Sequence, residues 1–143
     1  MCRTGGPRCP SSVSALNGGT RPPSIAALSR FVRDKLGMGR PEDTINGRTR
    51  LVLMYPDVVV KIPLNDEGDI SNRREYRTHS DPEGIPVAPV KLVDVGPVQV
   101  AIMERVVPHP KAFSDPSMPW WVSYVDCGQV GHLPNGKLVA YDL

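Results

Sequence analysis

Val58-Val59-Val60-Lys61-Ile62-Pro63 is the one place in the chain where a charged residue interrupts an apolar, β-branched stretch. Consecutive valines favour a β-strand because branched side chains fit a pleated sheet. A lysine inside such a strand lies at a solvated edge or faces an anionic group. Glu75 follows in the segment Asn72–Tyr76, which is typical of a helix. Lys61 and Glu75 are therefore a candidate strand–helix ion pair, either purely structural or part of an anion site.

Turn signals on both sides of this run divide the sequence into short strands. Pro56-Asp57, Gly96-Pro97 and Asn135-Gly136 each separate two strand patterns. The predicted strands are 48–55, 58–62, 87–95, 98–106, 129–133 and 137–141, the predicted helices are 25–32 and 70–80, and 65–68 is a predicted loop. The order β-β-α-β-β contains no βαβ unit. We therefore expect an α+β fold with a small antiparallel sheet, one or two packed helices and a C-terminal β-hairpin.

Length and composition indicate one domain, residues 24–143, behind a basic leader, residues 1–23. The 143 residues include 16 prolines and 13 glycines, which indicates short elements and many turns. The leader has few large apolar side chains, so we predict that it is disordered. Residues 1–40 carry seven Lys or Arg against one acid (+6), and the remainder carries ten against fourteen (−4). A mildly acidic body argues against nucleic-acid binding.

The sequence also bears on the setting of the protein. No run of about 20 apolar residues occurs, so we expect no membrane-spanning segment and no membrane partner. Cys2, Cys9 and Cys127 lack the spacing of a zinc site or a disulfide framework. Since the first residues also lack the apolar core of a signal peptide, we predict a reduced, cytoplasmic setting.

Several short motifs occur in an informative order. They are Gly47–Val52, Val59–Ile62, Glu75, Val100–Val106 and the hairpin Gln129–Asp142. This order resembles the N-terminal lobe of the protein-kinase-like fold, as in the very short kinase-like proteins encoded by bacteriophages. The resemblance covers roughly residues 36–143 and implies a kinase-N-lobe-like domain.

The resemblance implies a site for ATP and Mg²⁺. In such a site a glycine turn covers the phosphates, a strand lysine contacts them, and a helix glutamate orients the lysine. The strand that leads into the hinge then meets adenine through its backbone. The implied ATP-binding residues are Gly47, Lys61, Glu75, the gatekeeper Met103, Glu104 and Val106. The implied Mg²⁺ ligands are Gln129 and Asp142, and Asp126 is the candidate catalytic base.

The sequence departs from the kinase pattern at several points. Tyr124 stands where the resemblance expects the catalytic aspartate, and Gln129 stands for an asparagine. The turn at Gly47 has one glycine where kinases use three. The sequence ends at Leu143, one residue after Asp142, without an activation segment or a helical second lobe. These departures favour a binding module over a competent kinase.

Three functions stand as expectations from the sequence. The first is a minimal kinase-like or pseudokinase-like protein that binds ATP and acts mainly as a binding or regulatory module. Its protein partner, a host protein if the chain is phage-encoded, would contact residues 103–119 or the pair Trp120-Trp121. The second is an active minimal ATP-dependent phosphotransferase. The third is a small phage protein of unrelated α+β fold with a protein-binding role, in which Asp126 is a turn residue and Asp142 an ordinary acid.

Overall fold

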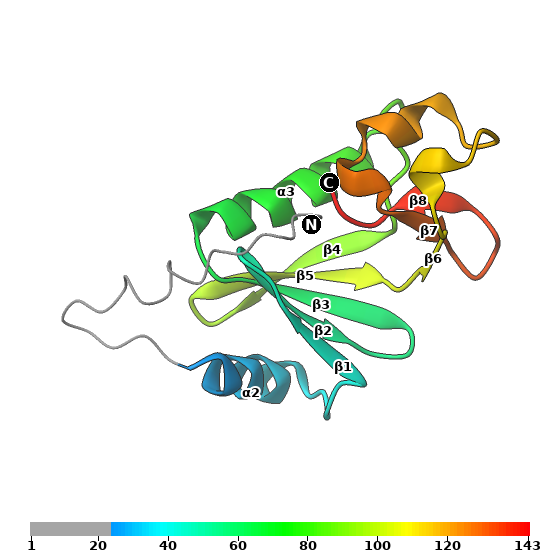
Figure 1. Cartoon of the computed structure of the whole chain (residues 1–143). Coiled ribbons are helices and arrows are strands. Elements are labelled where there is room, and N and C mark those ends of the chain that lie inside the picture. Colours follow the sequence, from blue (N-terminus) through cyan, green and yellow to red (C-terminus); the bar gives the residue numbers. More distant parts are fainter. Residues whose placement is uncertain (1–23) are drawn as a thin grey trace.

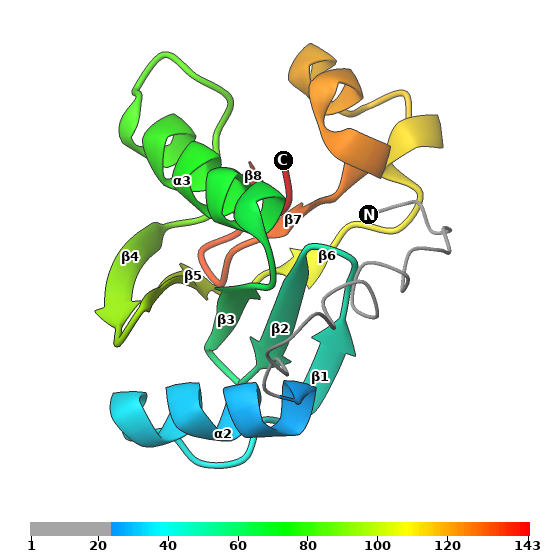
Figure 2. The same ribbon diagram turned by 90° about the vertical axis from the view of Figure 1, so that its left-hand side faces the viewer.

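The computed structural model describes residues 24–143, and the predicted disordered leader lies outside the described residues. Figure 1 shows a large sheet with one helix on each side and a smaller sheet beside it. Figure 2 shows from a second direction that the two helices, α2 and α3, lie on opposite sides of the large sheet. The architecture is α+β, as the sequence predicts.

Helix α2, Ile25–Leu36, has a capping residue at each end. The Ser24 side chain accepts a hydrogen bond from the Ala27 N–H at 3.0 Å. Gly37 ends the helix with a left-handed φ of 70°. The helix is longer than the predicted 25–32 because it continues up to this glycine.

The large sheet is antiparallel throughout, with the strand order β1-β2-β3-β5-β4. Its strands are β1 Asp43–Asn46, β2 Arg50–Met54, β3 Val58–Pro63, β4 Val90–Val95 and β5 Val98–Glu104. The β2–β3 and β4–β5 hairpins confirm the prediction. Strand β1 was not among the predicted strands. All four of its residues are exposed, so the sequence shows no apolar alternation there.

Helix α3, Asp66–Ser80, begins four residues earlier than predicted. The prediction of a loop at 65–68 is wrong because Asn65 caps the helix, its side chain accepting from the Gly68 N–H at 3.0 Å. Gly68 is needed for packing rather than for a turn. A Cβ at this position would lie 2.1 Å from the Thr49 backbone oxygen. The first turn of α3 therefore lies directly against the chain that enters β2.

The C-terminal part forms a second antiparallel sheet, in the order β6-β7-β8. Its strands are β6 Val107–Pro108, β7 Val130–His132 and β8 Leu138–Ala140. Three short 3₁₀ helices connect β6 to β7, namely η2 Ala112–Ser114, η3 Trp120–Tyr124 and η4 Asp126–Gly128. The β7–β8 hairpin confirms the prediction made from Asn135-Gly136.

Strand alternation divides the core between the two faces of the large sheet. Val60 and Ile62 of β3 pack with Val32 of α2 in one cluster. Val59 packs on the opposite face in a second cluster, which includes the C-terminal part. Lys61 shares the face of Val59 and therefore points toward α3. Within residues 24–143, no helix has the length and apolar character needed to cross a membrane.

Candidate functional site

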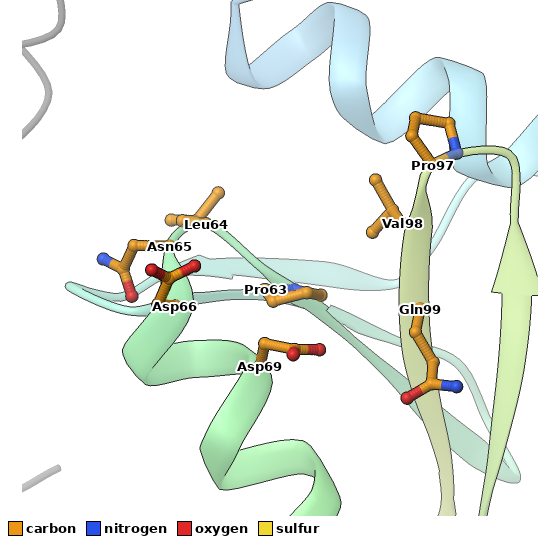
Figure 3. Close-up of a pocket in the computed structure, with 8 residues that line it drawn as sticks. All are labelled: Pro63, Leu64, Asn65, Asp66, Asp69, Pro97, Val98 and Gln99. Carbon is orange, nitrogen blue, oxygen red and sulfur yellow. The ribbon is translucent and has the colours of Figure 1, made fainter.

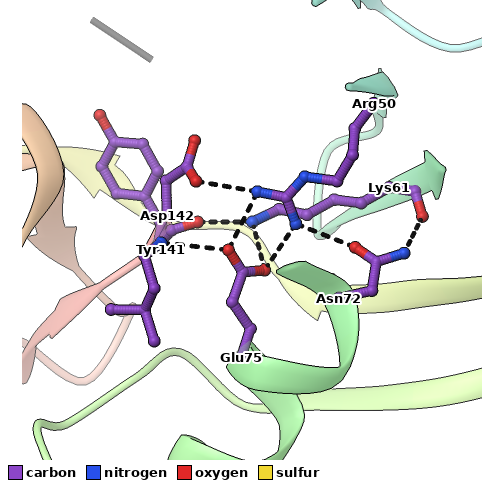
Figure 4. A network of polar contacts seen from close by, with 7 residues as sticks. Arg50, Lys61, Asn72, Glu75, Tyr141 and Asp142 are labelled. Atoms are coloured by element: carbon purple, nitrogen blue, oxygen red, sulfur yellow. Dashed lines mark hydrogen bonds and ion pairs between the residues drawn. The ribbon is translucent and has the colours of Figure 1, made fainter. Parts of the chain in front are cut away.

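Lys61 of β3 and Glu75 of α3 meet in the interior. The Lys61 Nζ lies 2.9 Å from the Glu75 Oε1, and the two residues are 5% and 0% exposed. Figure 4 shows both side chains inside a larger polar network between the sheet, α3 and the end of the chain. The strand–helix pair that the sequence indicates is therefore present, and it is buried rather than solvated.

Arg50 of β2 completes this network, although the sequence analysis gave it no role. Its guanidinium contacts both oxygens of Glu75 at 3.0 Å and reaches the Asp142 Oδ1 at 2.8 Å. Since Val52 pairs with Lys61 in the β2–β3 register, alternation places Arg50 on the same face as Lys61. Strand periodicity is thus the signal that could have identified Arg50.

Asn72 holds the Arg50 side chain and the Lys61 main chain. Its Oδ1 accepts from Arg50 at 2.9 Å, and its Nδ2 donates to the Lys61 backbone oxygen at 3.0 Å. Asn72 lies one helical turn before Glu75 on α3 and is completely buried. Because the oxygen and the nitrogen of its buried amide are each hydrogen-bonded, Asn72 joins β2, β3 and α3.

The last residues of the chain close the network from the opposite side (Figure 4). The Lys61 ammonium donates to the Tyr141 backbone oxygen, and the Leu143 N–H donates to the Glu75 Oε2 at 3.2 Å. Glu75 thereby accepts hydrogen bonds from Lys61, Arg50 and Leu143. This carboxylate is the centre of the network.

Among residues 24–143, the network contains two basic side chains, Lys61 and Arg50, and two carboxylates, Glu75 and Asp142. Burial raises the pKa of Glu75, but Lys61 and Arg50 more than offset this, so its pKa lies below the ordinary 4.5. Burial lowers the pKa of Arg50, but Glu75 and Asp142 raise it above its ordinary value. For Lys61, burial outweighs the attraction of Glu75 and lowers the pKa. Glu75 and Arg50 are therefore ionised at neutral pH.

The remaining residues of the implied ATP site lie along the same sheet. Gly47 lies in the β1–β2 turn, where its N–H donates to the Arg50 oxygen at 3.0 Å. Met103 is completely buried in β5, and Glu104 ends that strand. The Glu104 N–H donates to the Pro89 oxygen at 2.8 Å. Val106 is buried in the connection to β6.

The implied Mg²⁺ ligands lie at one end of the β7–β8 hairpin. The Tyr141 N–H donates to the Gln129 oxygen at 3.1 Å, so Gln129 lies opposite the residue that precedes Asp142. Mg²⁺ is commonly held by one or two carboxylates together with substrate phosphates. Asp142 supplies an oxygen donor of that kind beside Lys61 and Glu75. Within residues 24–143, no group of three or more His, Cys, Asp or Glu side chains is arranged to hold a metal ion.

Asp126, the candidate base, lies apart from this network. It is exposed at the start of η4, and in the described part of the chain no ion pair joins it to Lys61, Arg50 or Glu75. The network thus brings together Lys61, Glu75 and Asp142, but not Asp126.

A shallow pocket of about 500 Å³ lies at another place on the surface (Figure 3). It lies between the start of α3 and the β4–β5 hairpin. Its lining residues are Pro63, Leu64, Asn65, Asp66, Asp69, Pro97, Val98 and Gln99. None of the residues implied in ATP or Mg²⁺ binding lines it.

No known protein family, curated protein or solved structure matches this chain. The chemistry of the site therefore rests on its own geometry, which is a buried lysine and arginine held by two carboxylates. Such an arrangement can bind an anion through its cations or a cation through Asp142.

Proposed function

We propose that this chain is a kinase-like module that binds ATP with Mg²⁺ and acts by binding rather than by phosphoryl transfer. The observation that carries the proposal is the Lys61–Glu75 pair, 2.9 Å apart and buried between β3 and α3. In protein kinases the third-strand lysine and a glutamate of the helix αC form the ion pair that must be in place for ATP chemistry. Here the lysine is also on the third strand, and the helix that follows supplies the glutamate.

Asp142 adds independent support. The β7–β8 hairpin carries it back to the network, where its carboxylate lies 2.8 Å from Arg50. A metal-binding aspartate close to the lysine–glutamate pair is the third element of the kinase phosphate site. Asp142 joins the network through its contact with Arg50, which lies 92 residues earlier in the chain.

Each residue has a definite part in the proposed site. The Lys61 ammonium would bind the phosphates, and Glu75 would hold that ammonium in place. Asp142 and Gln129 would together hold Mg²⁺. When bound, this ion neutralises phosphate charge. The turn at Gly47 would cover the phosphates, and the backbone of Glu104 to Val106 would contact the adenine next to Met103.

The position of Asp126 favours binding over transfer. It is exposed in η4, outside the Lys61–Glu75 network, and Tyr124 is 72% exposed. A positioned general base typically contributes about 10²–10⁴-fold to a rate. We therefore expect nucleotide binding with little or no phosphoryl transfer, and the active phosphotransferase is the lesser alternative.

The test is thermal unfolding with and without Mg·ATP, for the wild type and for Lys61→Ala. A ligand at 100 times its Kd stabilises the native state by about 2.7 kcal/mol, which raises the Tm of a domain of this size by roughly 10 °C. The wild type should show this shift and Lys61→Ala should not. Lys91→Ala is the matched control, because Lys91 is an exposed lysine on β4 of the same sheet. Asp142→Asn, at a partly exposed position, replaces Lys61→Ala if that variant does not fold.

The outcomes separate the alternatives. Absence of any shift in the wild type would overturn the proposal. A shift without transfer of labelled phosphate to the protein or to added hydroxyl substrates supports the binding module. Transfer that is lost in Asp126→Asn would instead establish the phosphotransferase.

A specific observation also favours a protein-binding role. Large apolar side chains are exposed along residues 107–124. The Trp120 and Tyr124 rings lie edge to face, with their centroids 5.7 Å apart. The two tryptophans differ, since Trp121 packs against the core while Trp120 is 75% exposed. Cross-linking in cells that produce the protein, followed by mass spectrometry, should give a defined partner for the wild type. Trp120→Ser should lose that partner while the Tm shift with Mg·ATP is unchanged.

A further inference from the structure

The proposed function gives Arg50 no role of its own. We infer that Arg50 is an internal counter-ion that occupies Asp142 until nucleotide arrives, so that a divalent cation binds only together with nucleotide phosphates. This inference rests on the proposed function, because it concerns the regulation of that same site.

The geometry places Arg50 between the two carboxylates. One guanidinium nitrogen, NH1, contacts Asn72 at 2.9 Å and the Glu75 Oε1 at 3.0 Å. The other, NH2, contacts the Glu75 Oε2 at 3.0 Å and the Asp142 Oδ1 at 2.8 Å. The side chain is 7% exposed, so water screens these contacts little. Asp142 is the most accessible of the four charged members, with a side chain that is 19% exposed.

The position of Arg50 affects which ions can approach Asp142. The Arg50 guanidinium lies 2.8 Å from the Asp142 carboxylate and offsets its negative charge. A divalent cation that approaches Asp142 alone would lie beside the guanidinium, and the like charges would repel each other in a poorly screened setting. Free Mg²⁺ is therefore disfavoured at Asp142 in the wild type.

Nucleotide phosphates would relieve this repulsion between Arg50 and the divalent cation. They bring negative charge that attracts the guanidinium, and an arginine binds phosphate oxygens through two parallel hydrogen bonds. Arg50 can then exchange its contact with Asp142 for a contact with phosphate, which leaves Asp142 to the cation. Arg50 is thus a second phosphate-binding cation besides Lys61, and it makes the binding of cation and nucleotide cooperative.

The experiment measures Mn²⁺ binding by electron paramagnetic resonance, with and without ATP. Mn²⁺ alone should bind the wild type weakly, and ATP should increase the Mn²⁺ affinity. Arg50→Met removes one positive charge beside Asp142, so Mn²⁺ should bind this variant without nucleotide about tenfold more tightly or better. In the same variant the affinity for ATP should fall.

Arg73→Met is the matched control. Arg73 follows Asn72 on α3, but its side chain is exposed and pairs with Asp69. It should behave as the wild type in both measurements. Adding Asp142→Asn to Arg50→Met should abolish the Mn²⁺ binding that the single variant gained.

The results distinguish this inference from the proposed function. If the wild type binds ATP but Arg50→Met gains no affinity for Mn²⁺, the inference is wrong and the proposed function stands. If the wild type does not bind ATP while Arg50→Met gains Mn²⁺ binding at Asp142, the proposed function and the coupling to nucleotide are both wrong, and Arg50 is a counter-ion of Asp142 only. Tight Mn²⁺ binding to the wild type without nucleotide would overturn the inference even if Arg50→Met does not fold.

Discussion

Two arginine–glutamate pairs join the region around the start of β2 to helix α3, and both are bidentate. Arg48 contacts Glu67 through hydrogen bonds of 3.0 and 2.8 Å, and Arg50 contacts Glu75 through two of 3.0 Å. The side chains of the first pair are 54% and 60% exposed, whereas those of the second are 7% and 0% exposed. The two pairs have nearly the same geometry and differ mainly in burial.

Burial gives the second pair consequences that the first cannot have. Exposed ion pairs are typically worth about 0–1 kcal/mol, because water and salt weaken them. In a buried pair, the loss of one partner leaves an uncompensated charge in the interior. Glu75 also holds Lys61 and the backbone of Leu143, so any change at this carboxylate reaches the proposed site. The Arg48–Glu67 pair is a natural control for each measurement.

The largest expected effect is that of Glu75→Gln. This change keeps the shape of the side chain but leaves Lys61 and Arg50 with only one carboxylate between them. We expect a loss of about 3–5 kcal/mol in the free energy of unfolding, against about 0–1 kcal/mol for Glu67→Gln. Urea unfolding at neutral pH measures both. Equal losses in the two variants would show that burial does not distinguish the pairs.

Gly68→Ala should have the next largest effect, because Gly68 lies between the two pairs on α3. The added Cβ would lie 2.1 Å from the Thr49 oxygen, so the start of α3 must move away from β2. We expect a loss of about 1–3 kcal/mol, as for other overpacked contacts. The shift should weaken both pairs, which amide chemical shifts of β2 would report. Gly39→Ala is the control, since nothing lies within 4 Å of a Cβ at that position; an unperturbed Gly68→Ala would mean that α3 packs less closely.

The smallest expected effect is the change that salt makes to the pKa of Glu67 and of Glu75. Hydrogen bonding to Arg48 lowers the pKa of Glu67 below 4.5, and Lys61 with Arg50 lowers that of Glu75 despite burial. A lowered pKa in the folded state adds stability above the unfolded value, which is lost as the pH falls through the folded value. Raising NaCl from about 0.05 M to about 1 M should return the pKa of Glu67 toward 4.5 and leave that of Glu75 low. Carbon-13 NMR of the two carboxylates measures this; an equal response of both would contradict it.

Much of the fold could be predicted from local patterns. The β2–β3, β4–β5 and β7–β8 hairpins follow from turn residues between apolar runs, and the Lys61–Glu75 pair follows from a charge in such a run. The exposed strand β1 and the start of α3 could not be predicted in this way, because neither shows an apolar pattern. At Asn65 and Gly68 the residues typical of a loop serve instead as a helix cap and a packing contact.

The sequence by itself determined the antiparallel α+β class and the strand–helix pair of Lys61 and Glu75. These depend on side-chain periodicity and on elements that follow each other directly in the chain, as β3 and α3 do. Strand periodicity places Arg50 on the face of Lys61, but only the tertiary structure decided that Arg50, Asn72 and the segment Tyr141–Leu143 meet in one network. A contact such as Arg50–Asp142 spans 92 residues and leaves no periodic pattern, because it is set by how α3 and the β7–β8 hairpin pack against the sheet.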